Sequence, residues 1–303
     1  MKIIFFGTPQ IAVPSLEMLS AIPAFDVEAV FTQPDKKVGR KQTLEAPAVK
    51  KAAEELEIKV FQPANKKELI TNLEEFEDID FFVVFAYGML MPKKVLDMPK
   101  YDAINVHTSL LPKYRGASPI QEALLNGDSE TGISIMKMSE ELDAGDIYLI
   151  KRISIEGNDN LESLTENMGE FTKAILALAL EDIAEGNLQT IPQNESQATF
   201  CRKIEKNDGK VNLQEKTATE ILNMIRAYTP WPGVFFEIKG KKLKIINAKL
   251  SDENLSPGEF KIEDKTLKIG TKQGTILPQK VQLEGKNEMD IESFLNGQAP
   301  LFT

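Results

Sequence analysis

The sequence has few of the residues that cross-link a fold or hold a metal through sulfur. Its 303 residues include one cysteine, Cys201, so neither an internal disulfide nor a cysteine-based metal site can form. Such cysteine usage is typical of the reducing cytoplasm. No apolar run approaches the ~18 residues of a membrane span, and the apolar start at 1–7 indicates a buried strand and not a signal peptide. We expect a cytoplasmic monomer with no membrane partner.

Basic residues are fewer than acidic ones, 36 against 46, so the formal net charge is −10. Taken alone, this charge argues against a nucleic-acid partner. Residues 1–204 carry 21 basic and 32 acidic side chains, whereas residues 205–303 carry 15 and 14, so the last third has no acidic excess. Five lysines cluster there, which are Lys239, Lys241, Lys242, Lys244 and Lys249. They predict either a local basic patch or an edge strand whose lysines prevent pairing with another chain.

A dinucleotide fingerprint is absent from the first turn, Gly7–Gln10, which lacks the second and third glycines. The first half nevertheless alternates strand-like runs at 2–6, 27–32 and 81–86 with helix-like stretches at 14–21 and 47–56. Such alternation predicts an α/β domain with a Rossmann-like, mostly parallel sheet. Further strands at 131–138 and 147–153 and a long helix to about Ala184 would complete it, giving a first domain over 1–186.

The polar stretch that follows predicts a linker over 187–205. Beyond a helix at 218–228, five short strands at 234–238, 243–250, 258–262, 266–270 and 274–283 predict a C-terminal OB-like antiparallel β-barrel over 206–303. Trp231, between two prolines, is expected to be a packing anchor and not a platform for a base.

Histidine occurs once, as His107, and it is the only side chain whose ordinary pKa lies near neutrality. If 102–106 is a strand, Asn105 and His107 project from the same face at its carboxyl end. Ligands of open α/β sheets bind at that end. A donor imidazole needs an orienting carboxylate, and the acidic loop 139–146 offers two, Asp143 and Asp146. The spacing along the chain does not choose between them.

The order and intervals of these segments resemble those of the folate-dependent formyltransferases. The likeness consists of Asn105-x-His107, Ser-Leu-Leu-Pro at 109–112, Arg115-Gly116 and Asp143-Ala-Gly145. The extension to Ala117-Ser-Pro119-Ile and the C-terminal domain resemble the members whose acceptor is methionine esterified to initiator tRNA. The resemblance covers almost the whole chain.

The resemblance implies acyl transfer from 10-formyltetrahydrofolate to the methionyl α-amine, with no metal. Asn105 and His107 would donate to the oxyanion of a tetrahedral intermediate, and Asp143 would hold the imidazole and relay a proton. The folate site would be lined by Ser109, Leu110, Leu111 and Pro112 and by the loop Phe85, Ala86, Tyr87, Gly88, Met89 and Leu90.

The resemblance also implies two tRNA-binding regions. One is a flexible basic loop containing Lys36, Lys37, Arg40, Lys41 and Leu44, and the other consists of barrel lysines, which are Lys241, Lys242 and Lys244. Residues 42–45 are less basic than the family pattern leads us to expect, so Arg40 matches better than the positions after it.

Three rivals stay open at this point. A formyltransferase for an amino sugar or for glycinamide ribonucleotide would share Asn105, His107 and Asp143 but would not need the basic loop at 36–41. A hydrolase that releases formate from the same folate would share the donor site. A non-catalytic RNA-binding protein would have no reason to keep the three residues.

Overall fold

The computed structural model describes residues 1–39 and 42–302, and the contacts between residues divide the chain into two units. Unit 1 comprises Met1–Gly116, Glu130–Ser154 and Ser163–Phe200; unit 2 comprises Ala117–Ser129, Ile155–Glu162 and Cys201–Thr303. The division assigns 117–129 and 155–162 to the second unit, although both precede the linker predicted at 187–205. The domain limits proposed from the sequence therefore stay a prediction.

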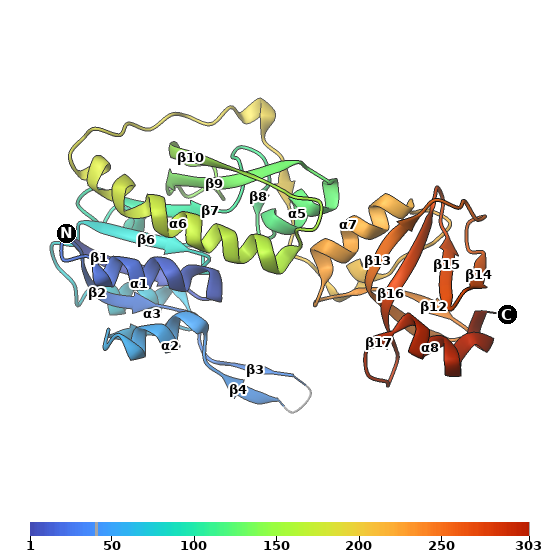
Figure 1. Cartoon of the computed structure of the whole chain (residues 1–303). Coiled ribbons are helices and arrows are strands. Elements are labelled where there is room, and N and C mark those ends of the chain that lie inside the picture. Colours follow the sequence, from blue (N-terminus) through green and yellow to red (C-terminus); the bar gives the residue numbers. More distant parts are fainter. Residues whose placement is uncertain (40–41, 303) are drawn as a thin grey trace. The chain divides into compact units, whose positions relative to one another are not determined.

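Unit 1 is built on a seven-stranded sheet (Figure 1). Its order is β10-β9-β7-β6-β1-β2-β5. The strands are β1 (Lys2–Gly7), β2 (Asp26–Phe31), β5 (Val60–Phe61), β6 (Phe81–Phe85), β7 (Asp102–His107), β9 (Glu130–Lys137) and β10 (Ile147–Ser154). The five strands from β5 to β7 are parallel, and β9 and β10 are antiparallel to their neighbours. The predicted mostly parallel sheet is confirmed.

Apolar strand sequences explain this sheet, because strands covered on both faces need side chains that can be buried on both. All five residues of β6 are buried. The helices of unit 1 are α1 (Val13–Ala21), α2 (Ala48–Glu55), α3 (Lys66–Leu73), α4 (Lys93–Leu96) and α6 (Leu161–Ala184). Helix α3 was not predicted, although Asn65 caps it by accepting hydrogen bonds from the Lys67 and Glu68 N–H groups.

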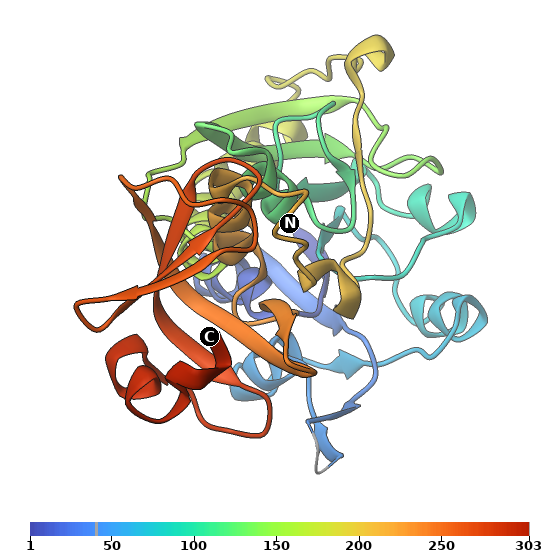
Figure 2. The same cartoon turned by 90° about the vertical axis from the view of Figure 1, so that its right-hand side faces the viewer.

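Two small pairs of strands lie outside the main sheet. Strands β3 (Lys36–Val38) and β4 (Thr43–Glu45) form an antiparallel hairpin that projects from the rest of unit 1 in both views (Figures 1 and 2). The sequence predicted a loop here, whereas in the structure Lys36 to Val38 pair with Thr43 to Glu45; the flexibility of this segment stays a prediction. The other pair is β8 (Arg115–Gly116) with β11 (Phe200–Cys201).

Unit 2 contains an antiparallel sheet, as predicted. Its strands are β12 (Val234–Ile238), β13 (Lys241–Ser251), β14 (Phe260–Glu263), β15 (Thr266–Gly270), β16 (Thr275–Leu283) and β17 (Met289–Asp290). In β13, Leu243 and Ile245 are buried while Lys242 is exposed, which is the alternation of a sheet with one solvated face. The helices are α5 (Pro119–Asn126), which packs against α7 (Ala218–Tyr228), and α8 (Ile291–Gln298).

Across the part of the chain that the structure describes, no helix is both long enough and apolar enough to cross a membrane.

Candidate active site

Strand β7 presents Asn105 and His107 on the same face, because side chains of a strand alternate. The strand is held on both sides: Asn105 lies opposite Val84 of β6 and Met136 of β9. Both polar side chains are nearly buried, since Asn105 is 9% exposed and His107 is 6% exposed. The sheet therefore fixes two hydrogen-bonding groups side by side at its carboxyl-terminal edge.

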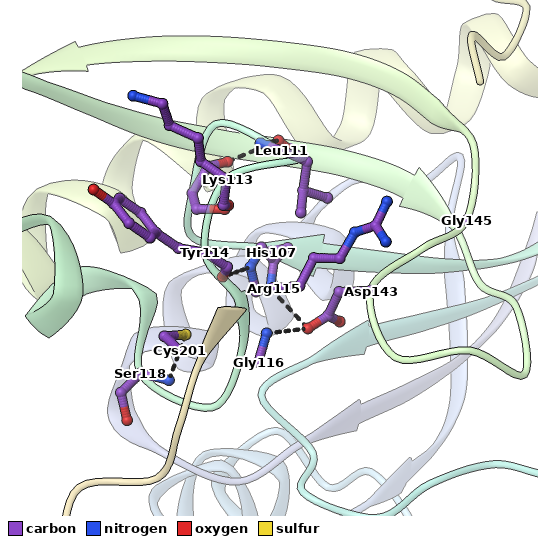
Figure 3. A network of polar contacts seen from close by, with 12 residues as sticks. His107, Leu111, Lys113, Tyr114, Arg115, Gly116, Ser118, Asp143, Gly145 and Cys201 are labelled. Carbon is purple, nitrogen blue, oxygen red and sulfur yellow. Dashed lines mark hydrogen bonds and ion pairs between the residues drawn. The ribbon is translucent and has the colours of Figure 1, made fainter. Parts of the chain in front are cut away.

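The segment after His107 is fixed by internal hydrogen bonds. The Ser109 hydroxyl donates to the Lys113 carbonyl at 2.6 Å. The Ser134 hydroxyl, on the neighbouring strand β9, donates to the Ser109 carbonyl at 2.7 Å and accepts from the Leu111 N–H at 3.1 Å. The turn so formed carries the Tyr114 carbonyl to 2.9 Å from His107 Nε2 (Figure 3).

This contact determines which imidazole nitrogen faces the site. A carbonyl oxygen only accepts hydrogen bonds, so His107 Nε2 carries a hydrogen and donates it to Tyr114. The other nitrogen, Nδ1, lies 3.7 Å from Asp143 Oδ2. The imidazole nitrogen that faces the Asp143 carboxylate is therefore Nδ1.

Asp143 reaches His107 from the loop between β9 and β10. Its backbone is left-handed, with φ of 50°, and the chain passes so close to β9 at Gly145 that a Cβ there would lie 1.8 Å from the Lys137 carbonyl oxygen. Asp143 Oδ2 accepts a hydrogen bond from the Gly116 N–H at 2.8 Å, and the carboxylate points toward the imidazole (Figure 3). The structure thus brings Asp143 to the imidazole, where the sequence spacing left the choice open.

Three polar residues that were not predicted as site residues surround this loop: Arg115, Gln193 and Glu195. Arg115 is 2% exposed and donates to Gln193 Oε1 and to both carboxylate oxygens of Glu195. The hydrogen bonds between Arg115 and Glu195 raise the pKa of the guanidinium and lower the pKa of the carboxyl group. Gln193 lies in the predicted linker, and no local motif marks it.

Four of the ten residues predicted to line the folate site are buried. Ser109 and Leu111 are buried, and Leu111 packs with Met136 and Ile147. Phe85, the last residue of β6, and Tyr87 in the loop that follows are buried, whereas Ala86, Gly88 and Leu90 are exposed. The Tyr87 carbonyl accepts a hydrogen bond from the Thr8 hydroxyl at 3.0 Å.

A cavity of about 460 Å³ lies in unit 1, and its lining residues include none from 85–90 or 109–112. Ala103, two residues before Asn105 on the same face of β7, lines it together with Leu96 of α4. The start of the Asp143 loop, from Met138 to Glu140, forms another part of the wall. The cavity therefore joins the strand that carries Asn105 to the loop that carries Asp143.

The predicted tRNA-binding residues lie in both units. In the β3–β4 hairpin, Lys36 and Lys37 are exposed and Leu44 is 64% exposed, whereas Arg40 and Lys41 lie outside the described residues. In unit 2, Lys241 and Lys242 are exposed, and the Lys242 ammonium lies 4.8 Å from the centre of the Phe235 ring.

Lys244 differs from the other two lysines because its Nζ donates to the Pro230 carbonyl at 3.0 Å. The neighbouring Trp231 was expected to be a packing anchor. That expectation was wrong: Trp231 is 55% exposed, since the turn from Thr229 to Gly233 carries its side chain outward. The Gly233 N–H closes this turn on the Tyr228 carbonyl at 2.8 Å.

The fold and this site match a known family in both parts of the chain. Residues 1–180 match the model described as formyl transferase, and residues 203–299 match that described as formyl transferase, C-terminal domain. The protein belongs to the formyl transferase family.

Its curated relatives carry a more specific name. A protein of Listeria monocytogenes serotype 4a named methionyl-tRNA formyltransferase is 42% identical over 301 residues, which cover 98% of this chain and 95% of the relative. A protein of the same name from Malacoplasma penetrans is 40% identical, over 99% of this chain and 94% of its own. Among solved structures, WlaRD, a sugar 3N-formyl transferase crystallised with dTDP and 5-N-formyl-THF, shares the fold with a TM-score of 0.69 at 22% identity, covering 95% of this chain and 99% of its own.

Proposed function

We propose that this protein transfers the formyl group of 10-formyltetrahydrofolate to the free α-amine of methionyl initiator tRNA in the cytoplasm, giving N-formylmethionyl-tRNA for translation initiation. The observation that carries the proposal is the 42% identity, over 98% of the chain, to a relative named methionyl-tRNA formyltransferase. The juxtaposition of Asn105, His107 and Asp143 supports it independently, because these three groups suit acyl transfer.

The reaction forms a bond between the amine nitrogen and the formyl carbon and breaks the bond from that carbon to N10 of the folate. In the tetrahedral intermediate the formyl oxygen carries negative charge. Asn105 donates a hydrogen bond to this oxygen. His107 donates one through Nδ1 in its protonated form, in which both ring nitrogens carry a hydrogen, because the hydrogen on Nε2 is already bonded to the Tyr114 carbonyl. Each such donor is worth about 2.7 to 4 kcal/mol. Asp143 accepts the proton that the amine loses and returns it, directly or through water, to the departing N10.

We assign the folate donor to the region around the Asp143 loop. The turn Ser109–Pro112 and the loop Phe85–Leu90 provide apolar walls and main-chain hydrogen-bonding groups. The 460 Å³ cavity supports this assignment, because its lining residue Ala103 shares a strand face with Asn105. A pterin ring held there would lie beside the strand that carries Asn105 and His107.

For the tRNA we assign sequence-independent phosphate contacts to the exposed lysines. Lys36 and Lys37 belong to the β3–β4 hairpin, where the exposed Leu44 offers an apolar contact to a base. Lys241 and Lys242 provide charge on unit 2. Lys244 contributes less, since its ammonium is already hydrogen-bonded to the Pro230 carbonyl.

The test is transfer of labelled formyl from 10-formyltetrahydrofolate to methionyl initiator tRNA, with wild type, His107→Ala and His107→Gln. Fast wild-type transfer that both variants lose at unchanged tRNA affinity supports the proposal, and the exposed Gln197→Ala serves as the control that keeps full activity. If the wild type binds the folate but formylates an amino sugar or glycinamide ribonucleotide instead of the tRNA, the acceptor is wrong. Release of formate without an acceptor would identify a hydrolase.

A further inference from the structure

The segment from Ile191 to Thr199, which we call the strap, crosses both loops of the candidate site. At one end, Ile191 and Ile147 exchange two backbone hydrogen bonds of 2.8 and 2.9 Å, next to the Asp143 loop. At the other end, Thr199 bonds to the loop that follows His107: its N–H donates to the Pro112 carbonyl and its hydroxyl accepts from the Tyr114 N–H. The strap therefore connects the loop of Asp143 with the loop whose carbonyl orients His107.

Gln193 is the strap residue whose side chain enters this network. Its Nε2 donates to the Asp143 carbonyl at 2.8 Å and to the Gly145 carbonyl at 2.7 Å. Its Oε1 accepts from Arg115 Nε at 3.1 Å and Nη2 at 2.8 Å. A primary amide has two N–H donors and two acceptor lone pairs, and here all four are used. Because guanidinium groups only donate and carbonyls only accept, the orientation of the amide is determined.

These contacts act where the loop backbone most needs support. Asp143 has a positive φ of 50°, a conformation that residues other than glycine rarely adopt without contacts to hold it. Gln193 holds the peptide carbonyls of Asp143 and Gly145, on both sides of the turn. The Asp143 side chain extends from this same turn. Its Oδ2 accepts a hydrogen bond from the Gly116 N–H and lies 3.7 Å from His107 Nδ1. A shift of the turn would move the carboxylate away from the imidazole.

We propose that Gln193 is a positioning residue for formyl transfer: clamped by Arg115, its amide holds the Asp143 turn so that the carboxylate faces His107 Nδ1. The inference rests on the proposed function for its kinetic consequences. It assigns the strap a part in the reaction although no strap residue needs to touch a substrate. Glu195 supports this arrangement indirectly, because its carboxylate accepts hydrogen bonds from Arg115.

The test compares Gln193→Glu with Gln197→Glu, the same substitution at an exposed strap position. Gln193→Glu keeps the length and the acceptor for Arg115 but removes both N–H donors to the two carbonyls. We expect kcat to fall about 10- to 100-fold, the effect of displacing a catalytic group by about 1 Å. KM for the folate and the thermal unfolding temperature stay near those of Gln197→Glu, and the pH dependence of kcat changes.

Coupling to Asp143 separates positioning from general stabilisation. In an Asp143→Asn background, Gln193→Glu should lower kcat by no more than about twofold further, because the group that it positions is already lost. Equal losses in both backgrounds, or a wild-type kcat and pH profile for Gln193→Glu, would overturn the proposal. If Gln193→Glu does not fold, Gln193→Met is used, and failure of both to fold would assign the residue to structure alone.

The single histidine gives a readout that needs no substrate. In ¹⁵N-labelled protein only His107 contributes imidazole signals. Gln193→Glu should alter the Nδ1 resonance, which faces Asp143, more than the Nε2 resonance, which is held by the Tyr114 carbonyl. If the wild type transfers no formyl to tRNA, the proposed function fails while this spectrum still tests Gln193. Unchanged Nδ1 and Nε2 signals in Gln193→Glu would refute the positioning role alone.

Discussion

Gly145→Ala should inactivate the protein by moving the Asp143 turn. A Cβ at Gly145 would lie 1.8 Å from the Lys137 carbonyl oxygen and 2.9 Å from its carbonyl carbon. The Lys137 backbone cannot retreat easily, because it pairs with Ile104 of β7 and its N–H bonds to the Asp146 carbonyl. Reaching even the 3.0 Å limit of real Cβ contacts requires the loop to move by about 1.2 Å.

The size of the effect follows from this displacement. Misplacing a catalytic group by about 1 Å costs about 10²-fold in rate, so kcat should fall by about two orders of magnitude. Overpacking a tight site costs about 1–3 kcal/mol of stability. For a unit of this size, a loss of about 2 kcal/mol lowers Tm by about 4–8 °C. The fall in activity should therefore persist at temperatures where the variant remains folded.

The assay is single-turnover formyl transfer, measured beside thermal unfolding followed by circular dichroism. Gly157→Ala is the matched control, since a Cβ there would meet nothing within 4 Å. It should retain wild-type kcat and Tm. If Gly145→Ala performs as well as Gly157→Ala, then the close approach at Lys137 does not hold the Asp143 turn and the reasoning is refuted.

Three further predictions concern single groups. Asn105→Ala should lower kcat about 10²- to 10³-fold through loss of one oxyanion donor. The measurement is the single-turnover rate at saturating folate. A smaller loss there would mean that Asn105 only binds substrate. Thr217 accepts from the Glu220 N–H at the start of α7, and its own N–H bonds to the Glu220 carboxylate, so that the pKa of Glu220 is lowered to about 2. Because this pKa is lower in the folded than in the unfolded protein, the stabilisation is complete above about pH 4.5 and is lost as the pH falls toward 2. In Glu220→Gln the free energy of unfolding, measured with urea, should therefore depend less on pH between these values. Thr217→Ala should lower the free energy of unfolding by about 1 kcal/mol. Lys241→Ala should weaken tRNA binding and reduce the salt dependence by about one unit of the log–log slope, whereas an equal effect of Lys244→Ala would contradict the engagement of its ammonium at Pro230.

The regular elements could be predicted because their apolar residues recur with the period of a strand or a helix. The apolar run Phe81–Phe85 became a central strand covered on both faces, and the alternation around Leu243 and Ile245 became an antiparallel strand. The same strand logic placed Asn105 and His107 on one face. Helices α3, α4, α5 and α8 and the β3–β4 hairpin were missed, since elements this short carry little periodicity.

The contacts that hold the candidate site could not be predicted in this way. Gln193 bonds to residues 48 and 50 positions earlier in the chain, and Arg115 bonds to Glu195, which is 80 positions away. Nothing in the neighbouring sequence of Gln193 differs from that of an exposed polar linker. Its role depends on the chain returning across a loop after the long helix α6, which only the three-dimensional arrangement provides.

Main-chain groups, more than side chains, determine the geometry around His107. The Tyr114 carbonyl accepts the hydrogen on Nε2, the Gly116 N–H donates to the Asp143 carboxylate, and the Gly145 carbonyl accepts from Gln193. Such groups exist at every residue, so no sequence motif can reveal them. The sequence does specify glycine where two backbone segments approach closely. Gly145 is such a position, because any side chain there would clash with the Lys137 carbonyl. Gly145, two residues after Asp143, is therefore the one feature of the loop sequence that indicates how the fold brings this carboxylate to His107.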